Sequence, residues 1–208
     1  MKKILLLVTA LTSIIYTNAQ NDKEPYMTKS LSGQSVNSAK AETSGGSIQV
    51  SGVSDNEARI EVFIRSSNSR YSYTKEEIAK KLEEDYNLEV SVSGGKVSAI
   101  ARTKRNNMNW EKALSISFKI YIPANSSTDL ATSGGSISLD NLNGTHDFRT
   151  SGGSLHIDKL TGKMKGRTSG GSITVLHSKD DINLHTSGGS INADDCTGTM
   201  ELVTSGGS

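Results

Sequence analysis

The amino-acid sequence predicts an all-β protein, a parallel β-solenoid whose coils are 18 residues long. Three observations favour this class of fold. The pentapeptide Thr-Ser-Gly-Gly-Ser recurs every 18 residues, at Thr132, Thr150, Thr168, Thr186 and Thr204, and a short constant period is typical of stacked repeats. Apolar and polar residues alternate after each copy, as in a half-buried strand. The repeats are also rich in glycine and contain no apolar stripe with helical spacing.

Each repeat predicts two short strands. In the first repeat, Ile137 and Leu139 are separated by a polar residue, which indicates a strand with one buried face. Later in each repeat a second alternating pair occurs, such as Ile182 and Leu184. The Gly-Gly of the pentapeptide and a second glycine, such as Gly144, supply residues suited to the turns between the strands. We therefore expect equivalent apolar residues of successive coils to stack on one another.

The sequence upstream of the regular repeats is less uniform. We expect residues 20–42 to be a flexible lead-in because they are mostly polar. A sixth copy of the pentapeptide begins at Thr43, and we interpret 43–208 as one β-solenoid domain. Within it, 43–131 would form irregular coils with an inserted helix and loop, and 132–208 the regular coils. A separate β-sandwich domain before the repeats is the alternative.

Three elements are predicted within the irregular region. Thr74 followed by Glu77 fits a capping box and predicts one short helix at about 75–85. Alternating residues on both sides of two glycines predict a β-hairpin over 88–101. A regular alternation of apolar residues over 114–122, ended by a proline, predicts a long strand.

The first residues have the features of a secretory signal peptide. Lys2 and Lys3 precede a mostly apolar run, and a small-residue cleavage site ends at Ala19. We therefore expect 1–19 to be removed and the mature chain to reach the periplasm, the outer surface or the medium. No later stretch is long and apolar enough to predict a membrane span. Because the sequence stops five residues into a repeat, at Ser208, we also expect further coils beyond it.

Charged residues give little support to metal binding or nucleic-acid binding. The formal net charge is +1, which gives no electrostatic argument for a nucleic acid or an anionic membrane as partner. Carboxylates recur at Asp140, Asp158 and Asp194, next to Asp195. A ladder of aspartates can attract Ca²⁺, but calcium needs about six to eight oxygen ligands, so we favour solvated aspartates in turns. Bound metal is the alternative.

The histidines and the cysteine do not predict a site either. His146, His156, His177 and His185 occupy four different positions of the repeat, which argues against convergence on one metal ion. The only cysteine, Cys196, is expected to be a small buried residue at a corner of the coil, with a reactive thiol as the alternative.

The last residue of the repeat suggests one binding surface. Arg149, Arg167 and His185 share this position, so they would stack along one edge and form a cationic stripe suited to anionic glycans. The alternative is a solvated edge whose charge nearby aspartates offset. The sequence has no nucleophile elbow and no phosphate-binding loop. We therefore predict no catalytic residues, no cofactor-binding residues, no metal ligands and no cofactor.

The pattern as a whole resembles a known bacterial family. A signal peptide, a strand ending in Ile122-Pro123-Ala124 and repeated Ser-Gly-Gly-Ser-Ile units resemble secreted β-solenoid proteins labelled "putative adhesins". The resemblance covers about 43–208 and implies an adhesin-like domain. It implies no catalytic or ligand-binding residues.

Together these observations favour an exported, non-enzymatic, adhesin-like or cell-envelope interaction protein that presents polar faces of a rigid scaffold. Its partners would be a glycan or a surface or matrix protein, and it could self-associate end to end. One alternative is a polysaccharide-active enzyme with its site near Arg102, Lys104, Arg105 and Trp110. The other is a structural envelope protein that self-associates.

Overall fold

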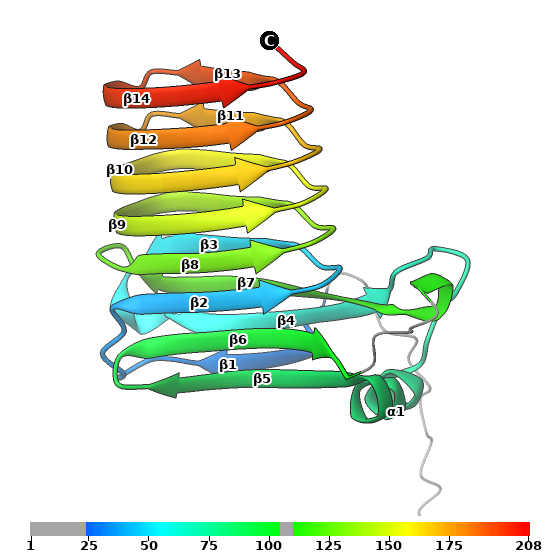
Figure 1. Ribbon diagram of the computed structural model, residues 1–208. Coiled ribbons are helices and arrows are strands. Elements are labelled where there is room, and N and C mark those ends of the chain that lie inside the picture. Colours follow the sequence, from blue (N-terminus) through cyan, green and yellow to red (C-terminus); the bar gives the residue numbers. More distant parts are fainter. Residues whose placement is uncertain (1–23, 105–109) are drawn as a thin grey trace, which may run out of the picture.

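A computed structural model describes residues 24–104 and 110–208 (Figure 1). The predicted signal peptide at 1–19 and the candidate residue Arg105 lie outside this part of the chain. The described chain contains one α-helix, two short 3-10 helices, η1 (Asp55–Glu57) and η2 (Trp110–Lys112), and 14 strands. The first strands are β1 (Met27–Ser30), β2 (Ser38–Thr43), β3 (Ile48–Val53) and β4 (Arg59–Ser66). Helix α1 (Lys75–Asp85) follows, and then β5 (Tyr86–Ser93), β6 (Lys96–Thr103), β7 (Leu114–Pro123) and β8 (Ser127–Thr132). The last strands are β9 (Ile137–Thr150), β10 (Leu155–Thr168), β11 (Ile173–Leu176), β12 (Lys179–Thr186), β13 (Ile191–Asp194) and β14 (Thr197–Thr204).

The predicted fold class, a parallel β-solenoid over 43–208, is wrong. The 14 strands of the described chain join one mixed sheet. Strand β4 pairs antiparallel with both β1 and β7, and β5 pairs antiparallel with β6. These strands replace the irregular coils that we expected at 43–131. Alternating apolar residues have the same period in parallel and antiparallel strands, so the sequence pattern shows which face is buried but not the direction of the neighbouring strand.

Within this mixed sheet, β9 to β14 pair in parallel. Leu155 of β10 lies between Ile137 of β9 and Ile173 of β11, so each residue is matched to the one 18 positions away. In the second half of β10, Met164 lies between His146 and Ile182. Figure 1 shows these strands stacked in layers toward the C-terminus. We call this stacked part, together with β2, β3 and β8, the ladder.

The upstream copy of the pentapeptide belongs to the ladder, although 89 residues separate Thr43 from Thr132. Strand β2 pairs in parallel with β8, and β3 pairs in parallel with β9. The chain leaves the ladder after β3, forms β4 to β7, and returns at β8. The expectation of a flexible lead-in at 20–42 is wrong for the described residues, because β1 and β2 lie there and Ala39 and Ala41 are buried.

Hydrogen bonds explain why the pentapeptide recurs. The hydroxyl of Thr150 donates to the carbonyl of Gly135 at 2.8 Å and accepts from the N–H of Gly153 at 3.2 Å. The N–H of Ser154 donates to the hydroxyl of Ser136, one layer away, at 3.1 Å. The equivalent Thr and Ser residues of later copies repeat these bonds. The first and fifth residues of each copy thus connect neighbouring layers.

The fourth residue of each copy must be glycine because the backbones of successive layers approach closely there. A Cβ at Gly153 would overlap the carbonyl oxygen of Gly135, and one at Gly171 would overlap that of Gly153. The third residue is less constrained, since the nearest atom to a Cβ would be 3.6 Å away at Gly152, although it would be 3.2 Å away at Gly188. Hydrogen bonds between layers therefore account for the first and fifth residues of the motif, and close packing of the backbone accounts for the fourth.

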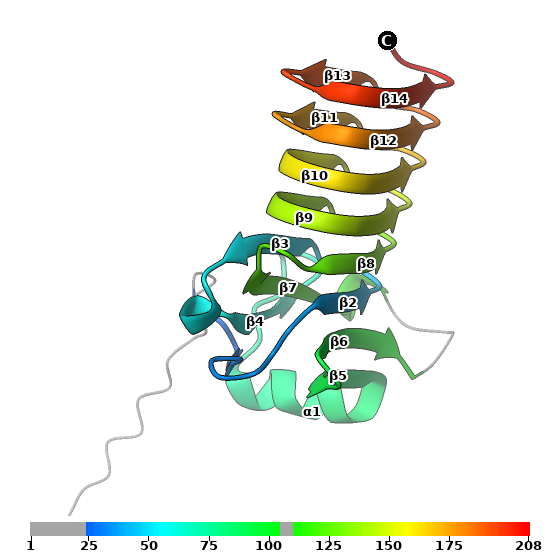
Figure 2. The ribbon, with the colours of Figure 1, turned by 90° about the vertical axis from the view of Figure 1, so that its left-hand side faces the viewer.

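The local elements predicted between the two parts of the ladder are confirmed. Helix α1 begins after Thr74, and Thr74 and Glu77 make both hydrogen bonds of the capping box. Strands β5 and β6 form the predicted hairpin, with Gly94 and Gly95 in its turn at positive φ. The long strand predicted at 114–122 is β7. Figure 2 shows α1 beside β5 and β6, at the end of the sheet away from β13 and β14.

Candidate functional site

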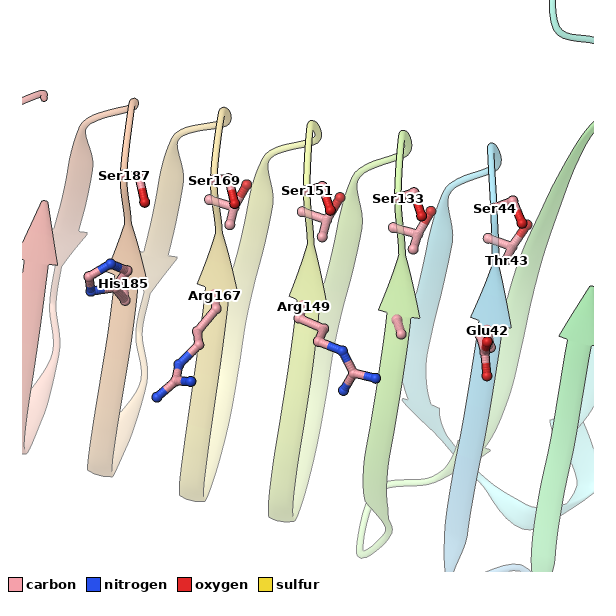
Figure 3. A pocket seen from close by; sticks show the side chains of 14 residues that line it. Glu42, Thr43, Ser44, Ser133, Arg149, Ser151, Arg167, Ser169, His185 and Ser187 are labelled. Atoms are coloured by element: carbon pink, nitrogen blue, oxygen red, sulfur yellow. The ribbon is translucent and has the colours of Figure 1, made fainter. Parts of the chain in front are cut away.

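An open groove crosses the strands of the ladder where they enter the pentapeptide turns (Figure 3). Its volume is about 720 Å³, and its lining comes from five successive layers: 42–44, 131–133, 149–151, 167–169, and His185 with Ser187. We call it the ladder groove. Every layer contributes the same positions of the repeat, so the groove follows directly from the 18-residue register.

One row of the ladder groove carries the positive charge. Arg167 lies between Arg149 and His185 in the parallel register. This confirms the predicted stacking of the three residues along one edge. Neighbouring strands are about 4.8 Å apart, and both arginine side chains are exposed. The row continues through Ala131 to Glu42 of β2.

The cationic row is not balanced by ion pairs. Among the described residues, neither Arg149 nor Arg167 has a carboxylate within ion-pair distance. Glu42 is the one carboxylate that lines the groove, and it already pairs with Arg102, whose Nε donates to it at 2.9 Å. The hydrogen bond from Arg102 is the main reason why the pKa of Glu42 is lowered, and the charge of Arg149 contributes. The arginine row therefore remains available to an external anion.

A row of hydroxyl groups runs beside the charged row. The second residue of each pentapeptide, as in Ser133, Ser151 and Ser169, lines the groove. These side chains are exposed, and their hydroxyls have no hydrogen-bond partner within the described chain. Unlike the fifth-position serines, they do not connect layers. The groove thus presents a periodic set of free hydroxyls next to guanidinium groups.

The aspartate ladder is not arranged as a metal site. Asp140 and Asp158 are neighbours, but Leu176 separates Asp158 from Asp194. A carboxylate oxygen of Asp158 lies 2.7 Å from Nδ1 of His177, and the other accepts a hydrogen bond from Nζ of Lys159 at 3.1 Å. Both hydrogen bonds lower the pKa of Asp158, and the one with His177 has the larger effect. In the part of the chain that the structure describes, no group of three or more His, Cys, Asp or Glu is placed to hold a metal ion.

The four histidines have separate environments. His146 is buried, with 1% of its surface exposed, and its Nδ1 lies 3.0 Å from the hydroxyl of Thr128. Desolvation lowers the pKa of His146 to about 4, so this side chain is neutral at pH 7. His156 is exposed, His177 contacts Asp158, and His185 lines the ladder groove. They do not converge.

Three of the four residues considered for an enzyme site lie in the described chain, and each has its own surroundings. Arg102 pairs with Glu42, Lys104 donates to the carbonyl of Glu83, and Trp110 lies in η2 with 59% of its surface exposed. Cys196 is partly buried and packs against the core, with its thiol directed to the carbonyls of Val175 and Asp194.

Sequence reasoning missed the part of the groove that comes from β2. Glu42 lines it although the sequence predicts a flexible lead-in at 20–42, and Ser44 lines it as the second residue of the sixth pentapeptide. The signal was present, because Glu42 precedes the sixth pentapeptide as Arg149 precedes a later copy. Aligning all six copies would have placed both residues in one row.

Comparison with known proteins gave no match to a protein-family model and no match to a curated protein. Two solved structures resemble the chain over most of its length. One is described as a "putative cell adhesion protein" from Clostridium sporogenes, with 10% sequence identity and a TM-score of 0.40 over 86% of this chain and 97% of that chain. The other is a "putative adhesin" from Parabacteroides distasonis, with 13% identity and a TM-score of 0.30 over 87% of this chain and 94% of that chain. With sequence identities and TM-scores this low, the two structures give no argument for the function of this chain.

Proposed function

We propose that this protein is an exported, non-enzymatic, adhesin-like protein that attaches to an extended partner at the cell surface through the ladder groove. The observation that carries the proposal is the groove itself, which presents a serine in each of five layers of the sheet, beside Arg149, Arg167 and His185 in three of them. A surface with one small set of contacts per layer binds by summing weak contacts, provided that the layers keep their spacing. Export is the part of the proposal that depends on the predicted signal peptide at 1–19.

Rigidity of the scaffold supports this mode of binding. Backbone pairing, threonine hydroxyls and serine hydroxyls all connect successive layers of the ladder. Buried side chains such as Leu155 and Ile173 stack between the layers. Because the layers are already fixed, a ligand that follows the ladder orders few protein groups when it binds, which lowers the entropic cost of association.

The lining of the groove does not favour hydrolysis. Glycoside hydrolysis generally needs two carboxyl groups on opposite sides of the scissile bond. Glu42 is the one carboxylate lining the groove, and Arg102 already neutralises it.

No helix of the described chain is long and apolar enough to cross a membrane. Both adhesin-named structures are consistent with this role, but the proposal is argued from the groove.

The proposal is tested by applying the purified mature protein to an array of glycans and matrix proteins, with product release assayed on the same polysaccharides. Saturable binding without product supports an adhesin-like role. Product release would overturn the non-enzymatic assignment, and absence of binding to every array member would overturn the attachment function.

A further inference from the structure

From the lining of the ladder groove we infer that its ligand is a linear acidic polysaccharide, with a carboxylate or sulfate on successive sugars, lying along the ladder axis. This inference rests on the proposed attachment function and names its ligand class. Three features of the groove carry it: the arginine pair, the spacing of the layers and the free hydroxyl row.

The arginine pair selects for anions. Arg149 and Arg167 lie directly beside each other in the parallel register, and like charges in this relation destabilise a sheet. Neither arginine has a carboxylate of the described chain within ion-pair distance, and Glu42, whose carboxylate interacts electrostatically with Arg149, is already paired with Arg102. A guanidinium group donates two parallel hydrogen bonds to a carboxylate or sulfate. A bound anion therefore removes a repulsion that the free protein retains.

The spacing of the layers favours a polymer over a single small anion. Successive strands are separated by about 4.8 Å, close to the length of one sugar residue in an extended polysaccharide. A chain parallel to the ladder axis therefore places about one sugar beside each layer. Acidic groups on the side of the polymer that faces the sheet can then reach Arg149 and Arg167, and His185 continues the row.

The hydroxyl row fits the sugar rings. Ser133, Ser151 and Ser169 offer one free hydroxyl per layer, able to donate to and accept from sugar hydroxyls.

Two other classes of polymer fit the groove less well. Its lining has no phenylalanine, tyrosine or tryptophan, whereas single-stranded nucleic acids are usually held by stacking of successive bases on such side chains. An extended peptide usually adds to a free strand edge, but the backbones of β8, β9 and β10 are paired on both sides at the groove. Sugar hydroxyls and acidic groups need neither feature.

The test uses the purified mature chain and measures binding to polygalacturonate, dextran sulfate and neutral dextran by calorimetry at low and moderate salt. Arg149→Gln/Arg167→Gln removes two charges from the groove. The matched control, Lys163→Gln/Lys165→Gln, removes two exposed charges from β10 outside the groove.

We expect the wild type to bind one or both acidic polymers and not neutral dextran. The arginine variant should lose about tenfold or more in affinity, because it lacks the charged hydrogen-bond donors of both guanidinium groups.

The outcomes separate this inference from the proposed function. A larger loss in the arginine variant than in the lysine control supports the groove, and the polymer that binds identifies carboxylate or sulfate as the preferred group. Equal losses in both variants would show diffuse charge attraction and overturn the inference. Binding to neutral glycans or proteins on the array, without binding to either acidic polymer, would overturn the inference while leaving the attachment function intact.

Discussion

Gly166 lies directly beside Phe148 in the register of β9 and β10, and its missing side chain makes room for the phenylalanine ring. A Cβ at Gly166 would overlap that ring and come within 2.7 Å of Leu184 Cδ2. Phe148 and Leu184 are both fully buried. The row that contains this pair reads Leu130, Phe148, Gly166, Leu184 and Leu202 in successive layers, so the glycine beside the phenylalanine offsets its larger volume.

Gly166→Ala should destabilise the protein by about 1–3 kcal/mol, the usual cost of overpacking a dense core. The free energy of unfolding from urea denaturation checks this value. Adding Phe148→Leu should recover part of the loss, since the smaller side chain leaves space for the new methyl group. If the double variant is less stable than Gly166→Ala alone, the two residues do not have the packing relation described.

Two adjacent glycines of one turn should respond differently to alanine. Gly153→Ala places a methyl group on the backbone of Gly135 and should cost about 2 kcal/mol or more, since backbone must move. Gly152→Ala meets no atom closer than 3.6 Å and should change the unfolding free energy by less than about 0.5 kcal/mol. Thermal unfolding of both variants checks the difference, and equal midpoints would contradict the close approach of the layers.

The two faces of β11 should also differ. Ile173 is fully buried, so Ile173→Asp introduces an unpaired charge into the core and should cost about 3 kcal/mol or more. Thr174 faces outward and is half-buried, so Thr174→Asp should be nearly neutral. Circular dichroism during denaturation compares the two. Similar losses would mean that the inward and outward faces are assigned incorrectly.

His146 should make stability depend on pH. Its pKa is about 4 in the folded protein, against an ordinary value of 6.5. The unfolded chain therefore binds more protons below pH 6.5, and stability falls as the pH decreases from about 6.5 to about 4, by about 3 kcal/mol in total. Above pH 6.5 this contribution is constant.

The control for this pH dependence is His146→Met, because Met164 occupies the same position in the next layer. The unfolding free energies of wild type and variant should be compared between pH 4 and pH 7. The wild type should lose more stability on acidification than the variant. Parallel curves would show that His146 is not the group responsible.

The sequence predicted local elements well because local signals determine them. The capping box of Thr74 and Glu77 fixed the start of α1, and alternating residues located β7 and the β5–β6 hairpin. Strand direction was not predictable, since β4 and β7 have the same alternation that a parallel pair would have. Strand β2 was missed because its inward residues, Ala39 and Ala41, are small and lie in a polar segment.

The candidate site was predicted in part. A fixed repeat places equivalent residues of neighbouring layers side by side, which is why Arg149, Arg167 and His185 could be grouped from the sequence. Their relation to Glu42 and Ser44 depends on the pairing of β2 with β8, across a long insertion. The second and fifth residues of the pentapeptide are both serine, so the sequence alone does not show that their roles differ. In the structure the fifth serine bonds the next layer and the second serine lines the groove.

The most direct test of the ladder groove is an NMR titration of the labelled protein with an oligogalacturonate, observing the side-chain Nε–Hε signals of Arg149 and Arg167. The account predicts that both signals shift with one saturation curve, together with the amides of Ser151 and Ser169, while the amides of Lys163 and Lys165 stay in place. Unchanged arginine signals, or shifts spread evenly over the outward face of β10, would contradict the assignment of the groove as the binding site.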